Sequence, residues 1–268
     1  MEIARYHYGA DLRRPFLFPV MGPSGRPVTR IGHPHDPVDH SHHNSIWISH
    51  EKVGGFNFWA DKPETRIAHQ KVTDLVDGDT ESSLTAENIW LNEDKPVIYE
   101  TRTIRTVDLG QGEWLMVFDL TFTPAGDEVL IDDSGFGMLA VRMAKTMGVN
   151  DGGGTIRNSE GAVNGEAVFR KPARWVDYSG PVATGVIEGI TFMDHPSNPN
   201  HPSPFHVRDD GWMGSSLTLG HPIVILKGSP LNLRYGLYVH AGLPPATAIE
   251  ERWNVFAATT VPHSPPKP

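Results

Sequence analysis

The segment Tyr99-Glu100-Thr101-Arg102-Thr103-Ile104-Arg105 decides the fold class, because its residues alternate between two kinds of face. In an extended chain Glu100, Arg102 and Ile104 point to one side, and the other four residues of the segment point to the opposite side. A period of two residues is typical of a β-strand. The segment is therefore predicted to be a strand of an antiparallel sheet.

Similar segments flank this strand and extend it into a meander. Clusters of Asp, Gly, Pro and Asn separate them. The strands expected in the meander are 65–73, 83–91, 97–107 and 114–123. Further strands are expected at 5–8, 14–20, 45–50, 136–143, 173–178, 183–192 and 205–208. A last hairpin is predicted to pair 222–227 with 231–240 across Gly228-Ser229-Pro230.

One helix is expected near the end of the chain. Thr247 and Glu250 have the spacing of a capping box, and Ile249, Trp253 and Phe256 follow at helical spacing. The chain shows no internal repeat and no domain boundary. The expected fold is therefore all-β and mainly antiparallel: a large β-sandwich or supersandwich over residues 1–261, with one short C-terminal helix and a proline-rich tail at 262–268.

The composition argues against several classes of function and partner. The chain has 268 residues, 38% of them hydrophobic, which is enough for a substantial core. A net charge of −9 without any Lys/Arg block argues against a nucleic-acid partner. The absence of cysteine excludes disulfides, iron–sulfur clusters, thiolate zinc sites and a cysteine nucleophile. Aliphatic runs are too short to cross a bilayer, so no membrane partner is expected. The N-terminus lacks an apolar signal core, so a cytoplasmic location is expected, or a periplasmic one if a leader was trimmed.

Histidines crowd into one stretch, since six of the 14 fall between His33 and His50. Within Asp39-His-Ser-His-His-Asn44, an extended chain would place His40, His42 and Asn44 on one face and His43 on the other. Imidazoles two residues apart on a strand face lie about 7 Å apart and can reach one ion or one substrate. The simpler alternative is a histidine-rich, hydrogen-bonded loop.

Several motifs together resemble the soluble bacterial PmoA-like proteins. They are Arg14-Pro-Phe-Leu-Phe-Pro-Val, Asp39-His-Ser-His-His, Ala173-Arg-Trp-Val-Asp-Tyr-Ser-Gly, Phe205-His-Val-Arg and Val239-His240. The methane-oxygenase label of these proteins does not suit this chain, because a particulate methane oxygenase subunit is a bundle of membrane helices. The resemblance implies a carbohydrate role instead, since such proteins tend to occur with sugar-processing enzymes. The expected sandwich is also similar, at fold level, to the galactose-mutarotase supersandwich.

The sequence departs from this resemblance at two places. Asn44-Ser45 stands where the family usually has Arg-Gly, and Gly236 stands where it usually has arginine. A substrate group normally bound by those guanidinium groups is therefore expected to be bound differently here.

The leading hypothesis is a carbohydrate-active enzyme with a histidine-rich cleft, acting on a sugar or keto-sugar glycoside by hydrolysis, elimination or epimerisation. Acid/base chemistry needs a proton donor and an acceptor with different pKa values, which His and Glu supply. The candidate catalytic residues are His42, His43, Glu100, His206 and His240. The candidate substrate-binding residues are Asn44, Trp47, Trp59, Arg142, Trp175, Tyr178, Asp194 and Arg208. Tryptophan offers flat faces to a pyranose, and Arg208 and Asp194 offer partners for hydroxyls or a carboxylate.

Metal assistance is left open, with His40, His42 and His206 as candidate ligands for Zn, Mn or Ni. Two rival functions are a non-catalytic carbohydrate-binding protein and a metal-dependent oxygenase with two His ligands and one carboxylate. The simpler alternatives are a surface charge pair for Glu100 and Arg102, a core histidine for His240, and core packing for the tryptophans. Exposed strand edges would also let two copies pair as a homodimer.

Overall fold

The computed structural model describes residues 2–32 and 40–260, so His33, His35, Asp39 and the predicted tail at 262–268 lie outside the described residues. In the described part the strands form three antiparallel sheets. The strands are β1 (Ala4–His7), β2 (Phe16–Val20), β3 (Ile46–His50), β4 (Thr65–Asp77), β5 (Glu81–Asn92), β6 (Lys95–Gly110), β7 (Glu113–Pro124), β8 (Glu128–Ile131), β9 (Gly137–Arg142), β10 (Thr155–Asn158), β11 (Lys171–Pro172), β12 (Trp175–Ala183), β13 (Val186–Asp194), β14 (Pro204–Arg208), β15 (Trp212–Ser215), β16 (Ile223–Leu226) and β17 (Leu231–Ala241).

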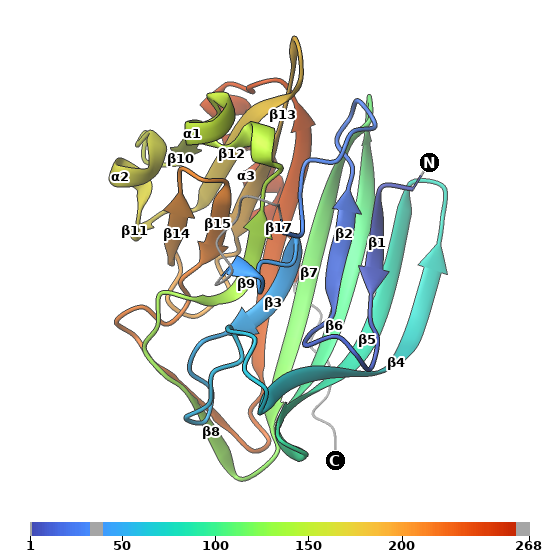
Figure 1. Ribbon diagram of the computed structural model, residues 1–268, viewed down its shortest axis with the longest axis vertical. Coiled ribbons are helices and arrows are strands. Elements are labelled where there is room, and N and C mark those ends of the chain that lie inside the picture. The colour runs from blue at the N-terminus through green and yellow to red at the C-terminus, as the bar shows by residue number, and fades with distance from the viewer. Residues whose placement is uncertain (1, 33–39, 261–268) are drawn as a thin grey trace.

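Two of the sheets pack face to face, which confirms the predicted antiparallel β-sandwich. The seven-stranded sheet has the order β1-β2-β3-β9-β15-β14-β11, and the eight-stranded sheet has the order β10-β12-β13-β17-β7-β6-β5-β4. Figure 1 shows the first sheet lying in front of the second. Both contribute to one hydrophobic core, with Ile48 and Leu139 from one sheet and Phe118 and Leu237 from the other.

The alternation predicted for residues 99–105 is confirmed in β6. Glu100, Arg102 and Ile104 are buried, whereas Tyr99 is 40% exposed. The buried side faces the other sheet, since Ile104 belongs to the core between the sheets. A charged pair therefore lies inside the sandwich.

The predicted hairpin between 222–227 and 231–240 is wrong. β16 pairs with β8, with Ile223 opposite Ile131. β17 lies inside the eight-stranded sheet and pairs with β7 on one edge and β13 on the other. Because both of its edges are occupied, the strand that precedes it must pair elsewhere.

The predicted terminal helix is confirmed as α3 (Ala246–Ala257), with Ile249 and Phe256 buried against the outer face of the eight-stranded sheet. The predicted capping box is wrong, because no side chain caps this helix and Glu250 instead accepts hydrogen bonds from Trp175 and Arg174. Three short helical segments were not predicted: η2 (Lys145–Met147), α1 (Val149–Gly152) and α2 (Asn164–Val168). Within residues 2–32 and 40–260, no helix has the length and apolar character needed to cross a membrane.

Candidate active site on the outer face of the seven-stranded sheet

The histidine-rich stretch covers an aromatic wall on the outer face of the seven-stranded sheet. Side chains alternate along β3, so Ile46 and Ile48 point into the core and Trp47 points outward. Trp212 on β15 points the same way, and Trp59 completes the wall from the loop after β3. The indole rings of Trp47 and Trp59 lie 5.3 Å apart, and those of Trp59 and Trp212 lie 5.7 Å apart.

His43 is part of this wall rather than a proton carrier. Its ring stacks on Trp47 at 5.3 Å and on Trp212 at 5.8 Å, and His40 stacks on it at 4.8 Å. Burial, and secondarily the charge of His42, lowers the pKa of His43 far below its ordinary value. The neutral ring is therefore a packing element, which argues against the predicted catalytic role.

His206 on β14 is also held neutral. Its Nδ1 lies 3.3 Å from the carbonyl oxygen of Gly135, which can only accept, so Nδ1 carries the proton. Burial, and secondarily the cation of Arg208, lowers the pKa of His206 to about 3. Nε2 is then an acceptor, and it receives a hydrogen bond from Nε of Arg208 at 3.4 Å. His206 therefore orients Arg208.

Arg208 lies beside the aromatic wall and is half-buried. Its Nη1 donates to Nε2 of His40 at 3.3 Å, and its guanidinium lies 5.6 Å from the ring centre of Trp212. Arg208 and His40 are half-buried, and so is His42, whose ring meets that of His43 edge-on at 4.5 Å. The structure thus brings together residues that the sequence separates by more than 150 positions.

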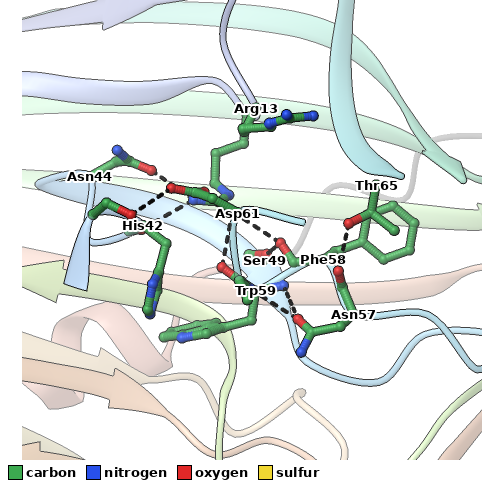
Figure 2. Close-up of polar contacts among 12 residues, drawn as sticks. Arg13, His42, Asn44, Ser49, Asn57, Phe58, Trp59, Asp61 and Thr65 are labelled. Atoms are coloured by element: carbon green, nitrogen blue, oxygen red, sulfur yellow. Dashed lines mark hydrogen bonds and ion pairs between the residues drawn. The ribbon is translucent and has the colours of Figure 1, made fainter. Parts of the chain in front are cut away.

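Arg14 anchors the histidine-rich stretch through the backbone of His42 and the side chain of Asn44. It was not predicted from the sequence as a site residue. Its Nη1 donates to the carbonyl oxygen of His42 at 3.1 Å and to Oδ1 of Asn44 at 2.8 Å. Its Nη2 donates to the carbonyl oxygens of Phe58 and Trp59 and to the Asp61 carboxylate. Figure 2 shows these acceptors converging from two segments. Asn44, predicted to bind substrate, uses its oxygen to hold Arg14.

Asp210 is a second group that the sequence did not single out. Its carboxylate accepts from Nη1 of Arg142 at 2.8 Å, and 35% of its side chain is exposed. The only available signal was the pair Asp209-Asp210 directly after the predicted strand that carries His206 and Arg208. Arg142 itself, predicted to bind substrate, is buried beneath this carboxylate.

Glu100 does not reach the histidine cluster, contrary to the prediction of one shared cleft. It lies between the two sheets, and its carboxylate accepts from Trp90 Nε1 and Arg102 Nε, each at 2.6 Å. The histidines lie on the other side of the seven-stranded sheet. The surface charge pair considered as an alternative is also wrong, because Glu100 and Arg102 are each 1% exposed.

His240 is separated from the cluster by the sandwich itself. It shares the outer face of the eight-stranded sheet with Tyr238, and its Nε2 contacts the buried Asp177 at 2.8 Å. Arg157 and Thr191 complete the hydrogen bonding of this carboxylate. The alternative of a satisfied core histidine fits this geometry.

Three further candidates have structural contacts away from the wall. Trp175 donates to Glu250 of α3, and Asp194 holds Asn198, His201 and Ser203 in the loop after β13. Tyr178 lies in the core between the sheets and donates to the carbonyl oxygen of Arg208.

The predicted metal ligands His40, His42 and His206 do not form a metal-binding group within the described residues. In the described part of the chain, no group of three or more His, Asp or Glu side chains is arranged to hold a metal. The guanidinium of Arg208 also donates to one nitrogen of His40 and one of His206, so a cation already lies between two of the three predicted ligands. The two-histidine, one-carboxylate set of an oxygenase is not formed among these residues either.

Residues 1–254 match the model of a family described as a family of unknown function, DUF6807. No curated protein matches the chain significantly.

Proposed function

The chain belongs to this family of unknown function, and we propose that it is a carbohydrate-active enzyme whose substrate lies over the outer face of the seven-stranded sheet. One observation carries the proposal. The half-buried His40 contacts Arg208, and the half-buried His42 meets His43 edge-on, both beside a wall of stacked aromatic rings. Small-molecule sites commonly combine apolar, aromatic walls with a few polar groups of this kind.

His42 is the proton carrier in this proposal. Hydrolysis, elimination and epimerisation of a sugar each require a proton to leave one atom and to arrive at another. His43 and His206 are kept neutral by burial and do not supply that proton, whereas His42 is only half-buried. Arg14 holds the backbone of His42, and the ring of His42 lies against those of His43 and Trp59.

Asp210 is the candidate partner of His42. Its carboxylate is partly exposed and is held by Arg142, so it can accept a hydrogen bond from a substrate hydroxyl without being free to swing away. A carboxylate and an imidazole have different ordinary pKa values, which suits the two ends of a proton transfer.

The resemblance to PmoA-like proteins supports the same substrate class, because those proteins tend to occur with sugar-processing enzymes. Galactose-mutarotase supersandwiches, similar at fold level, also handle sugars. These likenesses are analogies and support the proposal beside the geometry.

The proposal is tested by assaying the purified protein on a panel of glycosides and keto-sugar glycosides. His42→Gln is expected to lower turnover by about 10²–10⁴-fold, the usual range for losing a proton-transfer group. His221→Gln is the matched control, because His221 is exposed in a loop outside the wall. Circular dichroism checks that both variants fold. Unchanged turnover in His42→Gln would overturn the assignment, and sugar binding without turnover in the wild type would favour the binding module.

A further inference from the structure

Arg208 differs in its partners from four buried arginines of this protein. Arg14, Arg102, Arg142 and Arg234 each have a carboxylate oxygen within 3.0 Å. Among residues 2–32 and 40–260, Arg208 forms no such ion pair, and its contacts are two imidazoles and an indole ring. The nearby Asp210 carboxylate is already bonded to Arg142.

The two imidazoles hold the guanidinium in place without neutralising it. His206 accepts through Nε2 because its Nδ1–H faces the carbonyl oxygen of Gly135. His40 also accepts through Nε2, so its remaining proton is on Nδ1. Both rings are neutral acceptors in this arrangement, and the positive charge of Arg208 is left for another group to balance.

The remaining hydrogen-bonding capacity of Arg208 fits one planar anion. A guanidinium has five N–H groups, and the imidazoles take one at Nε and one at Nη1. Those left include an N–H on each of Nη1 and Nη2, which form the fork that binds a carboxylate in two parallel hydrogen bonds. One unbalanced positive charge matches a carboxylate better than a phosphate, which carries more than one negative charge at neutral pH.

The same ring cluster holds further donors without partners. Nδ1 of His40 and the indole nitrogens of Trp47 and Trp212 are buried and have no hydrogen-bond partner within residues 2–32 and 40–260. Burying an N–H without a partner is energetically unfavourable, so such groups usually meet a bound molecule or water. These unpartnered donors are an observation separate from the unbalanced charge of Arg208, and they too indicate a polar ligand.

We infer that the substrate is a sugar acid whose carboxylate is bound by Arg208. This inference rests on the proposed carbohydrate function and names its substrate class. His206 and His40 act as positioning residues that orient the guanidinium by hydrogen bonds, and the ring of Trp212 packs against it.

The test measures binding by calorimetry with three probes: D-glucuronate, methyl glucoside as the neutral sugar, and acetate as a carboxylate without a sugar. Wild type is expected to bind glucuronate about ten- to a hundredfold more tightly than methyl glucoside, the usual gain from a charge-assisted hydrogen-bond pair. Arg208→Gln should lose this preference and keep its affinity for the neutral sugar. Arg208→Lys should keep only part of it, because lysine lacks the fork.

Arg105→Gln is the matched control, since it removes the same charge from the outer face of the other sheet, where Arg105 pairs with Glu81. It should bind all three probes like wild type. Equal affinity of wild type for glucuronate and methyl glucoside would overturn this inference and leave the proposed function standing. Acetate bound as tightly as glucuronate would overturn the carbohydrate function while supporting the carboxylate site.

Discussion

Glu100 and Arg102 form an ion pair, with Oε1 and Nε 2.6 Å apart, that is sealed between the two sheets. Trp90 and Asn88 supply further hydrogen bonds to the same carboxylate. The carboxylate is therefore bonded to three groups of the core, Arg102, Trp90 and Asn88, and is not available to a substrate. A buried pair of this kind fixes how neighbouring strands meet, because either charge alone would be costly to bury.

Glu100→Gln is expected to lower the free energy of unfolding by about 3–5 kcal/mol, because it leaves Arg102 buried without its counter-charge. Chemical denaturation measures the loss. Replacing both residues, as in Glu100→Gln combined with Arg102→Met, should recover part of it. Ligand binding at the histidine cluster should stay at the wild-type level in the folded fraction, and a selective loss of binding in a stable Glu100→Gln variant would contradict this assignment.

Arg14→Gln is expected to destabilise the protein by about 3–5 kcal/mol, since Asp61 and four other acceptors lose their shared donor. Its neighbour Arg13 is the control, because it is exposed and donates to one carbonyl oxygen, that of Pro63. Arg13→Gln should change stability by no more than about 0.5 kcal/mol. Thermal unfolding of the two variants side by side makes the comparison, and equal effects would show that the Arg14 network is unimportant.

Glu250→Ala is expected to lower stability by about 1–3 kcal/mol, because its carboxylate joins α3 to Trp175 and Arg174, and the Trp175 indole N–H would be left unpaired. Thr247→Ala should leave stability unchanged or raise it slightly, since the Thr247 side chain is exposed and does not cap the helix. Urea titration of both variants checks this. A larger loss in Thr247→Ala than in Glu250→Ala would restore the capping box.

Acidification below pH 6.5 is expected to destabilise the fold through its buried histidines. Burial lowers the pKa of His50 to about 4 and that of His206 to about 3, from 6.5 in an exposed histidine. The unfolded chain therefore binds more protons throughout this window. The free energy of unfolding is fully retained above 6.5 and falls as pH decreases toward the folded pKa values, by about 1.4 kcal/mol per group and pH unit.

The His50→Gln variant separates the contribution of His50 to this pH dependence from the contributions of other titrating groups. The loss of stability between about pH 7 and about pH 5 should be smaller in this variant than in wild type by about 2 kcal/mol. Urea unfolding at both pH values provides the numbers. Parallel losses in the two proteins would mean that His50 takes up a proton in the folded state as readily as in the unfolded one.

Much of the fold was predictable because local patterns report which face of a strand is buried. The alternation in 99–105 predicted the buried side of β6, and the spacing of Ile249 and Phe256 predicted the packed face of α3. The pairing of β16 was not predictable from its neighbour in sequence, because β17 already uses both of its edges. Pairing depends on which edges other strands have occupied, and that information is not local.

The sequence by itself determined an antiparallel β-sandwich and directed attention to His40, His42, His43, His206 and Arg208. Only the tertiary structure decided that these residues meet on the outer face of one sheet, while Glu100 lies inside the sandwich and His240 on its far side. Alternation tells which residues of one strand share a face, but it does not tell which faces of distant strands lie together. Packing of the sheets decides that, and with it which histidines stay neutral and that Arg208 contacts imidazoles.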